Sequence, residues 1–166
     1  MLGMYLENPD CFRVSVAFFV ASAEPMNLLK PTNKPESWRL EQVDGGKAEM
    51  KVDEDSVLFQ VSAVDSTDWH VQAVQTNLDL KDGSSYRIKF KARSPEKVTI
   101  SVNAMIDQDD WHEIGLHEEV NLEKEYKEYS FEFQANGTVS KKNRISFVLG
   151  NAKGLVQLKD VVLTAK

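Results

Sequence analysis

The chain has 166 residues, of which 42% are hydrophobic and 28% charged, and this length and composition suit one domain with its own core. Its formal net charge of −6 argues against DNA or RNA as a partner, because nucleic-acid-binding proteins present a basic face to the phosphates. No apolar run reaches the roughly 18 residues that cross a bilayer, so no membrane span is expected.

The N-terminal segment, residues 1–23, has the pattern of a secretory signal peptide. Arg13 precedes a short apolar stretch at 14–20, and the small residues Ala21-Ser22-Ala23 follow it, as a signal peptidase requires. We therefore expect cleavage after Ala23 and a secreted or cell-envelope protein. The alternative is a disordered N-terminal tail, because acidic residues upstream of Arg13 are atypical of a signal peptide.

The single cysteine, Cys11, lies within this segment. A mature chain without cysteine has no disulfide, thiol chemistry or cysteine-based metal site. Its stability must therefore come from core packing.

Residues 24–36 contain Pro25, Pro31 and Pro35 and predict an extended lead-in, because proline opposes helix and biases the residue before it toward extended backbone. The domain proper is expected at 37–166. Trp38 near its start is interpreted as a core or edge-packing residue.

Beyond the lead-in, short runs in which every second residue is apolar alternate with turn residues. The clearest run is 86–93, where Tyr86, Ile88, Phe90 and Ala92 alternate with cations. Strands are likewise predicted at 48–52, 57–62, 69–76, 98–106, 129–133, 145–149 and 155–163. Turns are predicted at 44–46 and 81–83, and a hairpin turn at Asn136-Gly137.

This pattern predicts about eight to ten strands without the helical crossovers that parallel strands require. The expected fold class is therefore all-β, an antiparallel β-sandwich or barrel.

Several segments carry a recognisable pattern of residues in a fixed order. The most specific runs from Leu80 to Arg93, with a leucine, two residues and Gly83, then Tyr86, alternation through Phe90 and a closing Ala-Arg pair. Shorter matching segments lie at 69–73, 125–133, 143–150 and 158–163. Together they resemble the family 4/9 carbohydrate-binding modules, over about Asn27 to Thr164.

The resemblance implies a jelly-roll sandwich of the galactose-binding-like type, with a sugar-binding cleft on one concave sheet. It implies a non-catalytic module that binds a polysaccharide or oligosaccharide of the β-glucan or xylan type, in a family associated with glycoside hydrolases. We expect a monomer.

Candidate binding residues follow from what a sugar requires. A pyranose presents an apolar face and a rim of hydroxyls, so its site needs aromatic platforms and polar side chains. Trp69 and Trp111 are the candidate platforms, because each follows a polar loop rather than lying within an apolar run. For Trp69 the alternative is core packing, since it would share a strand face with Val71 and Ala73.

The polar candidates lie on predicted strands. His70 and Gln72 would occupy the face opposite to Trp69, and the resemblance places Gln72 in the cleft. The outward positions Arg93, Asn103 and Arg144 offer hydrogen bonds to hydroxyls. The alternative for each of them is a solvated strand face.

Two other functions stay open. The first is a protein-interaction or envelope-structural domain, because sandwich folds host unrelated functions. The second is a glycosidase using acids such as Asp109 and Glu113, although abundant loop acids say nothing about their separation. A zinc-protease motif is excluded, because His112 and His117 are one residue too far apart for it. We therefore expect no enzyme.

No cofactor is required. The resemblance implies an optional structural calcium ion, with Asp160 as the candidate ligand. Lys159 beside it opposes a cation.

Overall fold

The computed structural model describes residues 24–166, and the predicted signal peptide lies outside the described residues. Sheet A contains, in spatial order, β1 (Arg39–Gln42), β4 (Val71–Leu78), β9 (Asn143–Val148), β6 (Thr99–Ile106) and β7 (Glu113–Asn121). Sheet B contains β2 (Lys47–Val52), β3 (Ser56–Ala63), β10 (Gly154–Ala165), β5 (Ser85–Arg93) and β8 (Lys127–Gln134). Two short 3-10 helices, η1 (Pro35–Ser37) and η2 (Asp68–His70), complete the described part.

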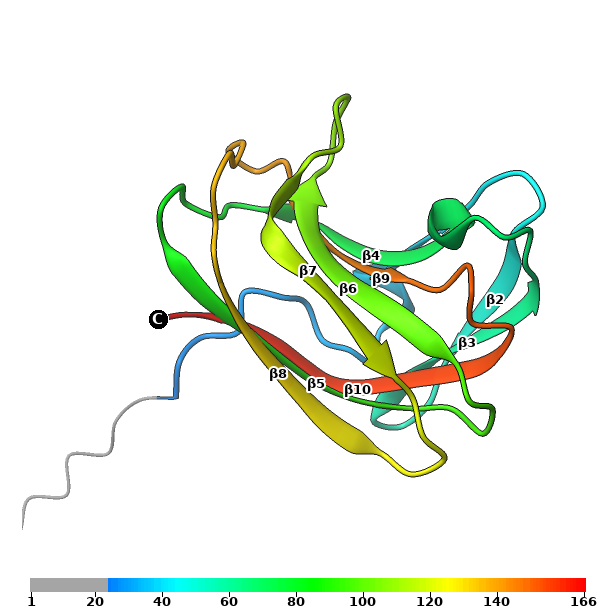
Figure 1. Cartoon of the computed structure of the whole chain (residues 1–166). Coiled ribbons are helices and arrows are strands. Elements are labelled where there is room, and N and C mark those ends of the chain that lie inside the picture. The colour runs from blue at the N-terminus through cyan, green and yellow to red at the C-terminus, as the bar shows by residue number, and fades with distance from the viewer. Residues whose placement is uncertain (1–23) are drawn as a thin grey trace, which may run out of the picture.

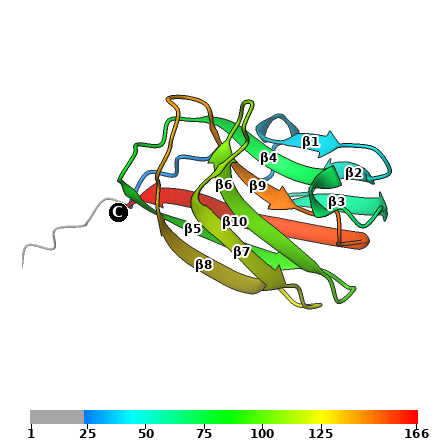
Figure 2. The same cartoon turned by 45° about the horizontal axis from the view of Figure 1, so that its top comes forward.

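The two five-stranded sheets face each other as the layers of a sandwich (Figures 1 and 2). Every strand pairing is antiparallel, and the chain crosses repeatedly between the sheets. The prediction of an all-β jelly-roll sandwich is confirmed. Neither 3-10 helix among residues 24–166 has the length and apolarity of a membrane-crossing helix.

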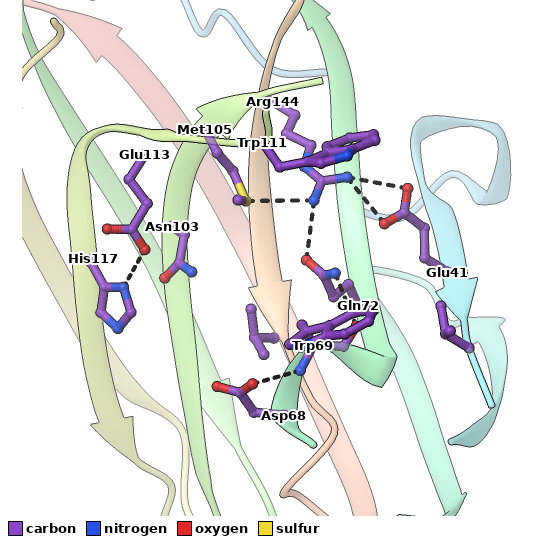
Figure 3. Close-up of a pocket in the computed structure, with 12 residues that line it drawn as sticks. Glu41, Asp68, Trp69, Gln72, Asn103, Met105, Trp111, Glu113, His117 and Arg144 are labelled. Atoms are coloured by element: carbon purple, nitrogen blue, oxygen red, sulfur yellow. Dashed lines mark hydrogen bonds and ion pairs between the residues drawn. The ribbon is translucent and has the colours of Figure 1, made fainter. Parts of the chain in front are cut away.

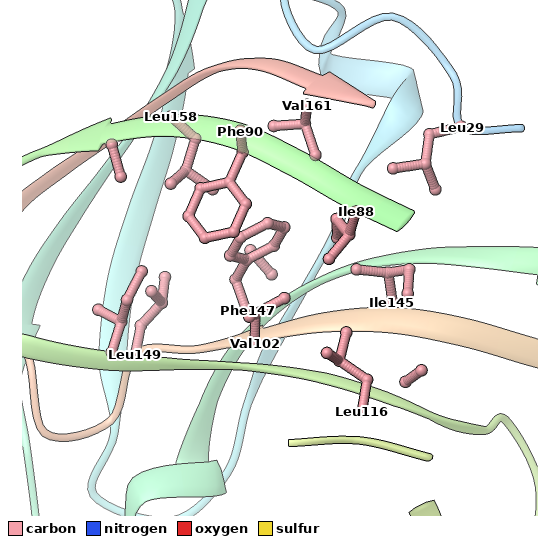
Figure 4. Close-up of a cluster of buried hydrophobic side chains, with 14 of the residues drawn as sticks. Leu29, Ile88, Phe90, Val102, Leu116, Ile145, Phe147, Leu149, Leu158 and Val161 are labelled. Atoms are coloured by element: carbon pink, nitrogen blue, oxygen red, sulfur yellow. The ribbon is translucent and has the colours of Figure 1, made fainter. Parts of the chain in front are cut away.

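The core lies between the sheets and is filled by alternate residues of each strand (Figure 4). On β5, Ile88 and Phe90 are fully buried while Lys89 between them faces outward, as the period of two requires. Phe90 meets Phe147 of β9 edge to face, with ring centroids 5.0 Å apart, and so joins the two layers.

Trp38 packs in this core, as predicted. Its ring contacts Phe59 and Phe147 at centroid distances of 5.9 Å, and its indole Nε1 donates to the carbonyl of Thr32 at 2.8 Å. The lead-in before it is attached to the domain, because the backbone N–H of Leu28 donates to the carbonyl of Leu163 on β10.

Two local predictions are wrong, and a strand of sheet A was not predicted. Trp69 does not begin a strand, because η2 occupies 68–70 and β4 begins at Val71. Asn136-Gly137 is not a hairpin turn, because β8 pairs with β5 in sheet B whereas β9 pairs with β4 and β6 in sheet A. Strand β7 was not predicted, because its apolar alternation breaks at Glu118.

Candidate functional site

A cleft of about 630 Å³ lies over the outer face of sheet A (Figure 3). Its floor consists of residues that alternate with core residues along three central strands. On β9, Arg144 and Val148 line the cleft while Ile145 and Phe147 between them are buried in the core. Gln72 of β4 and Met105 of β6 extend this floor, opposite Val148 and Arg144 respectively.

Trp69 borders the cleft from helix η2 and is half exposed, at 50%. Because the chain forms a 3-10 turn here, the side chain leaves the strand face that Val71 and Ala73 occupy, and the core-packing alternative does not apply. The turn rests on Gly150, whose N–H donates to the carbonyl of Asp68 at 2.8 Å. A Cβ at Gly150 would lie 2.1 Å from that oxygen, so glycine permits this close approach.

Trp111 borders the cleft from the loop 107–112, which connects β6 to β7 and projects beyond the sheet at the top of Figure 1. It is 46% exposed. Trp111 and Asp110 both have left-handed backbone, with φ of 47° and 87°, which non-glycine residues adopt at a cost. A hydrogen bond from the N–H of Ile106 to the carbonyl of His112 closes the loop.

Gln72 joins the centre of the floor to Trp69. Its Oε1 accepts a hydrogen bond from the hydroxyl of Ser146 at 2.6 Å and another from Arg144 at 3.3 Å, while its Nε2 donates to the carbonyl of Trp69 at 3.0 Å. The amide is therefore held in one orientation below the tryptophan.

Arg144 is almost fully buried, and two carboxylates neutralise it. Its Nη1 lies 3.0 Å from Glu41 of β1 and 3.4 Å from Asp107, and the same two acids bind Arg39. We call these four residues the charge network. The hydrogen bond to Asp107, above all, raises the pKa of Arg39. Because the charges balance, Arg144 lies beneath the cleft without an excess positive charge.

The guanidinium of Arg144 also supports Trp111. Its Cζ lies 4.9 Å from the centroid of the indole ring, a cation–π arrangement that joins the floor to the loop 107–112. One ring face is therefore covered by the arginine, which leaves the other for a ligand.

Asn103 and His117 form the polar wall on the β6–β7 side. They are directly opposite each other in register, and both line the cleft. Asn103 is buried and its Oδ1 has no hydrogen-bond partner among the described residues. The Nδ1 of His117 bonds to Glu113, and this bond raises the pKa of His117. An acceptor without a partner beside an imidazole suits a ligand that carries hydroxyl groups.

The structure thus brings together five of the predicted binding residues, and they lie within one cleft: Trp69, Gln72, Asn103, Trp111 and Arg144. It places the other two elsewhere. His70 points behind Trp69, where its Nδ1 bonds to Asp65 at 2.7 Å and its ring meets the indole edge to face. Arg93 is on β5 in sheet B, where it bonds to Gln157 and covers the ring of Tyr126. It therefore cannot share a site with the cleft residues.

The other lining residues were not predicted as binding residues, and Glu41, Met105 and His117 are three of them. Each occupies an outward position in its strand, which is the only sequence signal they carry. That signal is shared by the outward residues of sheet B.

Asp160, the predicted calcium ligand, bonds to Lys91 at 2.8 Å at a bulge in β10. Among residues 24–166, no three acids, histidines or cysteines cluster closely enough to hold a metal ion. The calcium ion stays a prediction.

Comparisons with known proteins show which domains this chain is similar to in sequence and in fold. A family model, CBM_4_9, described as a carbohydrate binding domain, matches residues 32–154. No curated protein gives a significant sequence match. A solved CBM4 structure is 23% identical, with a TM-score of 0.71, and the match covers 86% of this chain and 95% of that one.

Two further solved structures share the fold. The N-terminal cellulose-binding domain of Cellulomonas fimi β-1,4-glucanase C is 20% identical with a TM-score of 0.67, covering 87% of this chain and 98% of that one. The CBM22-1 xylan-binding domain of Paenibacillus barcinonensis Xyn10C is 8% identical with a TM-score of 0.56, covering 87% and 97%.

Proposed function

Because the chain belongs to the CBM_4_9 family of carbohydrate-binding domains, we propose that its cleft binds a neutral polysaccharide chain of the β-glucan or xylan type and does not cleave it. The observation that carries this proposal is the pair of half-exposed tryptophans, Trp69 and Trp111, that border one polar-floored cleft.

The cleft matches the two surfaces of a pyranose ring. Indole faces stack against the apolar C–H face, while amides and imidazole exchange hydrogen bonds with the hydroxyl rim. Trp69 and Trp111 provide the indole faces, and Asn103 and His117 provide the amide and the imidazole. Gln72 and Arg144 are already bonded within the protein, so we assign them the role of holding the tryptophans in place.

The charge of the lining favours a neutral ligand. Among the described residues that line the cleft, Arg144 carries the fixed positive charge, and Glu41 and Asp107 neutralise it. Asp68 and Glu113 add negative charge to the same lining. A uronic acid would therefore meet carboxylates without a free cation to bind it.

The same contacts support binding without hydrolysis. A glycosidase needs two carboxyl groups free to act on opposite sides of the scissile bond. Here Glu41 is engaged with two arginines and Glu113 with His117. By name, the two matched binding domains belong to β-1,4-glucanase C and to Xyn10C. Any catalysis linked to this chain would belong to another domain or polypeptide.

Location and assembly complete the proposal. A polysaccharide ligand fits the extracytoplasmic location predicted from residues 1–23, and a cleft formed within one chain fits a monomer.

Affinity gel electrophoresis and titration calorimetry test this function on the full chain. We expect binding to cellohexaose, laminarihexaose or xylohexaose, none to polygalacturonate, and no release of reducing sugar. The double variant Trp69→Ala/Trp111→Ala should lose binding, while the exposed Lys124→Gln control keeps it. Binding that survives in the double variant would place the ligand elsewhere, and release of reducing sugar would support the glycosidase alternative.

A further inference from the structure

The loop that carries Trp111 needs support from outside itself. Asp110 and Trp111 are consecutive non-glycine residues in left-handed backbone, a conformation that persists only where surrounding contacts hold it. Arg144 supports the indole from below. A second contact holds the backbone of the loop, and it is made by the next residue, His112.

Both ring nitrogens of His112 make hydrogen bonds. Nδ1 lies 2.8 Å from Oδ2 of Asp110, and Nε2 lies 2.8 Å from the carbonyl oxygen of Gly137. A carboxylate and a carbonyl are both acceptors only, so each nitrogen must carry a proton to donate to its partner. The neutral imidazole carries one proton and satisfies one of the two bonds. The full arrangement therefore requires the imidazolium ion.

The segment that contains Gly137 is itself held in place by hydrogen bonds. Gly137 lies in the segment that crosses from β8 to β9, and its N–H donates to Oδ1 of Asp82 at 2.5 Å. The N–H of Thr138 donates to the same oxygen at 3.2 Å. His112 thus ties the loop 107–112 to a segment that is itself anchored on the loop between β4 and β5.

We propose that His112 is a positioning residue for Trp111, and that its protonation fixes the tryptophan over the cleft and so makes glycan binding depend on pH. This inference rests on the proposed function and adds its regulation. Affinity is highest when the imidazolium makes both bonds, and it falls when the loss of a proton releases one of them.

The groups around His112 favour its protonated form. The hydrogen bond to Asp110, followed by that to Gly137, raises the pKa of His112 above its ordinary value of about 6.5. The contact is therefore complete below about pH 6.5 and is lost as the pH rises through the raised value. Asp110 contacts the imidazole directly. The other charged groups on the loops around it are Asp79, Lys81, Asp82, Asp107, Asp109, Glu113, Lys141 and Lys142.

His117 is the group most easily confused with His112 in such a profile. The pKa of His117 is also raised. Unlike His112, His117 lines the cleft. Variants of each histidine separate the two contributions.

The first test needs no glycan. NMR spectra of the full chain from about pH 5 to about pH 9 follow the imidazole of His112 and the indole N–H of Trp111, which Trp111→Phe identifies. We expect the indole signal to titrate with the pKa of His112. In His112→Gln this titration should disappear, and in Asp110→Asn it should move to lower pH. An indole signal that is constant through the titration of His112 would overturn the proposal.

The second test measures affinity for the oligosaccharide that binds best. Between the two pH limits the wild type should weaken by roughly twofold to fivefold, the range expected of an exposed ionic hydrogen bond. His112→Gln should bind the oligosaccharide weakly at both pH limits. His117→Gln should still lose affinity as the pH rises, because His112 is intact in this variant. A wild-type profile reproduced by His112→Gln would contradict the proposal. Absence of binding at every pH would instead refute the proposed function, and the NMR titration would still decide the role of His112.

Discussion

The guanidinium of Arg144 lies 4.9 Å below the centre of the Trp111 ring. Arg144 belongs to the central strand of sheet A and Trp111 to a loop at its end, so this contact transmits the position of the sheet to the exposed indole. The same guanidinium bonds to Glu41 and Gln72, and Gln72 in turn bonds to the carbonyl of Trp69. Both tryptophans therefore depend on one buried arginine.

Arg144→Ala should lower the free energy of unfolding by about 2–3 kcal/mol, because it leaves two largely buried carboxylates with one arginine between them. Arg144→Lys keeps the charge but loses the planar group that reaches Glu41, Gln72 and Trp111 together, and it should recover only part of the loss. Urea unfolding measures both variants. An Arg144→Ala protein as stable as the wild type would show that the charge network adds nothing to stability.

The three tryptophans should separate binding from stability. Trp69→Ala and Trp111→Ala should each weaken glycan binding by about tenfold or more, with little change in stability, because both side chains are half exposed. Trp38→Ala removes a buried ring and should cost about 3–5 kcal/mol of stability. Calorimetric titration and thermal unfolding of the same preparations provide the comparison. Large stability losses in Trp69→Ala or Trp111→Ala would argue that these rings are structural.

Asn103→Ala should reduce affinity by about fivefold, equivalent to one hydrogen bond of about 1 kcal/mol. Its stability should hardly change, because the Oδ1 atom that is removed has no partner in the protein among residues 24–166. Asn103→Asp offers a matched comparison, since it keeps the acceptor and adds a negative charge to a lining that already contains Glu113. If Asn103→Ala binds as the wild type does, the amide does not contact the ligand.

Acid should weaken the support beneath Trp69. The hydrogen bond with His70 is the main cause that lowers the pKa of Asp65 below its ordinary value of about 3.9. A lowered carboxyl pKa contributes stability that is present above the ordinary value and is lost as the pH falls through the folded-state value. We expect the melting temperature to fall below about pH 4, and Asp65→Asn to lack this component. If the melting temperatures of the wild type and Asp65→Asn fall in parallel with pH, Asp65 does not cause the loss of stability in acid.

Gly150→Ala should cost about 2 kcal/mol of stability and should also weaken binding, because the added methyl group would lie 2.1 Å from the carbonyl oxygen of Asp68 and displace η2 with Trp69. Gly83→Ala is the contrasting variant, since its Cβ would meet no atom within 4 Å and the cost is that of its positive φ alone. If Gly150→Ala binds the glycan with the affinity of the wild type, the position of η2 does not control binding.

Local patterns in the sequence determined the sandwich and its core. Alternation along 86–93 predicted which side of β5 is buried, because a strand turns successive side chains to opposite faces whatever its neighbours are. The position of Trp38 near the start of the domain led to its interpretation as a core or edge-packing residue. Alternation also identified Asn103 and Arg144 as outward residues, and the polar loops before Trp69 and Trp111 marked both tryptophans as candidate platforms.

Only the tertiary structure decided which outward residues share a surface. Arg93 and Arg144 look alike in sequence, yet strand order places Arg93 on sheet B and Arg144 under the cleft on sheet A. Strand order depends on pairing between distant segments, which periodicity does not encode. The release of Trp69 from the core face depends likewise on Gly150, a residue far along the chain that allows η2 to form against it.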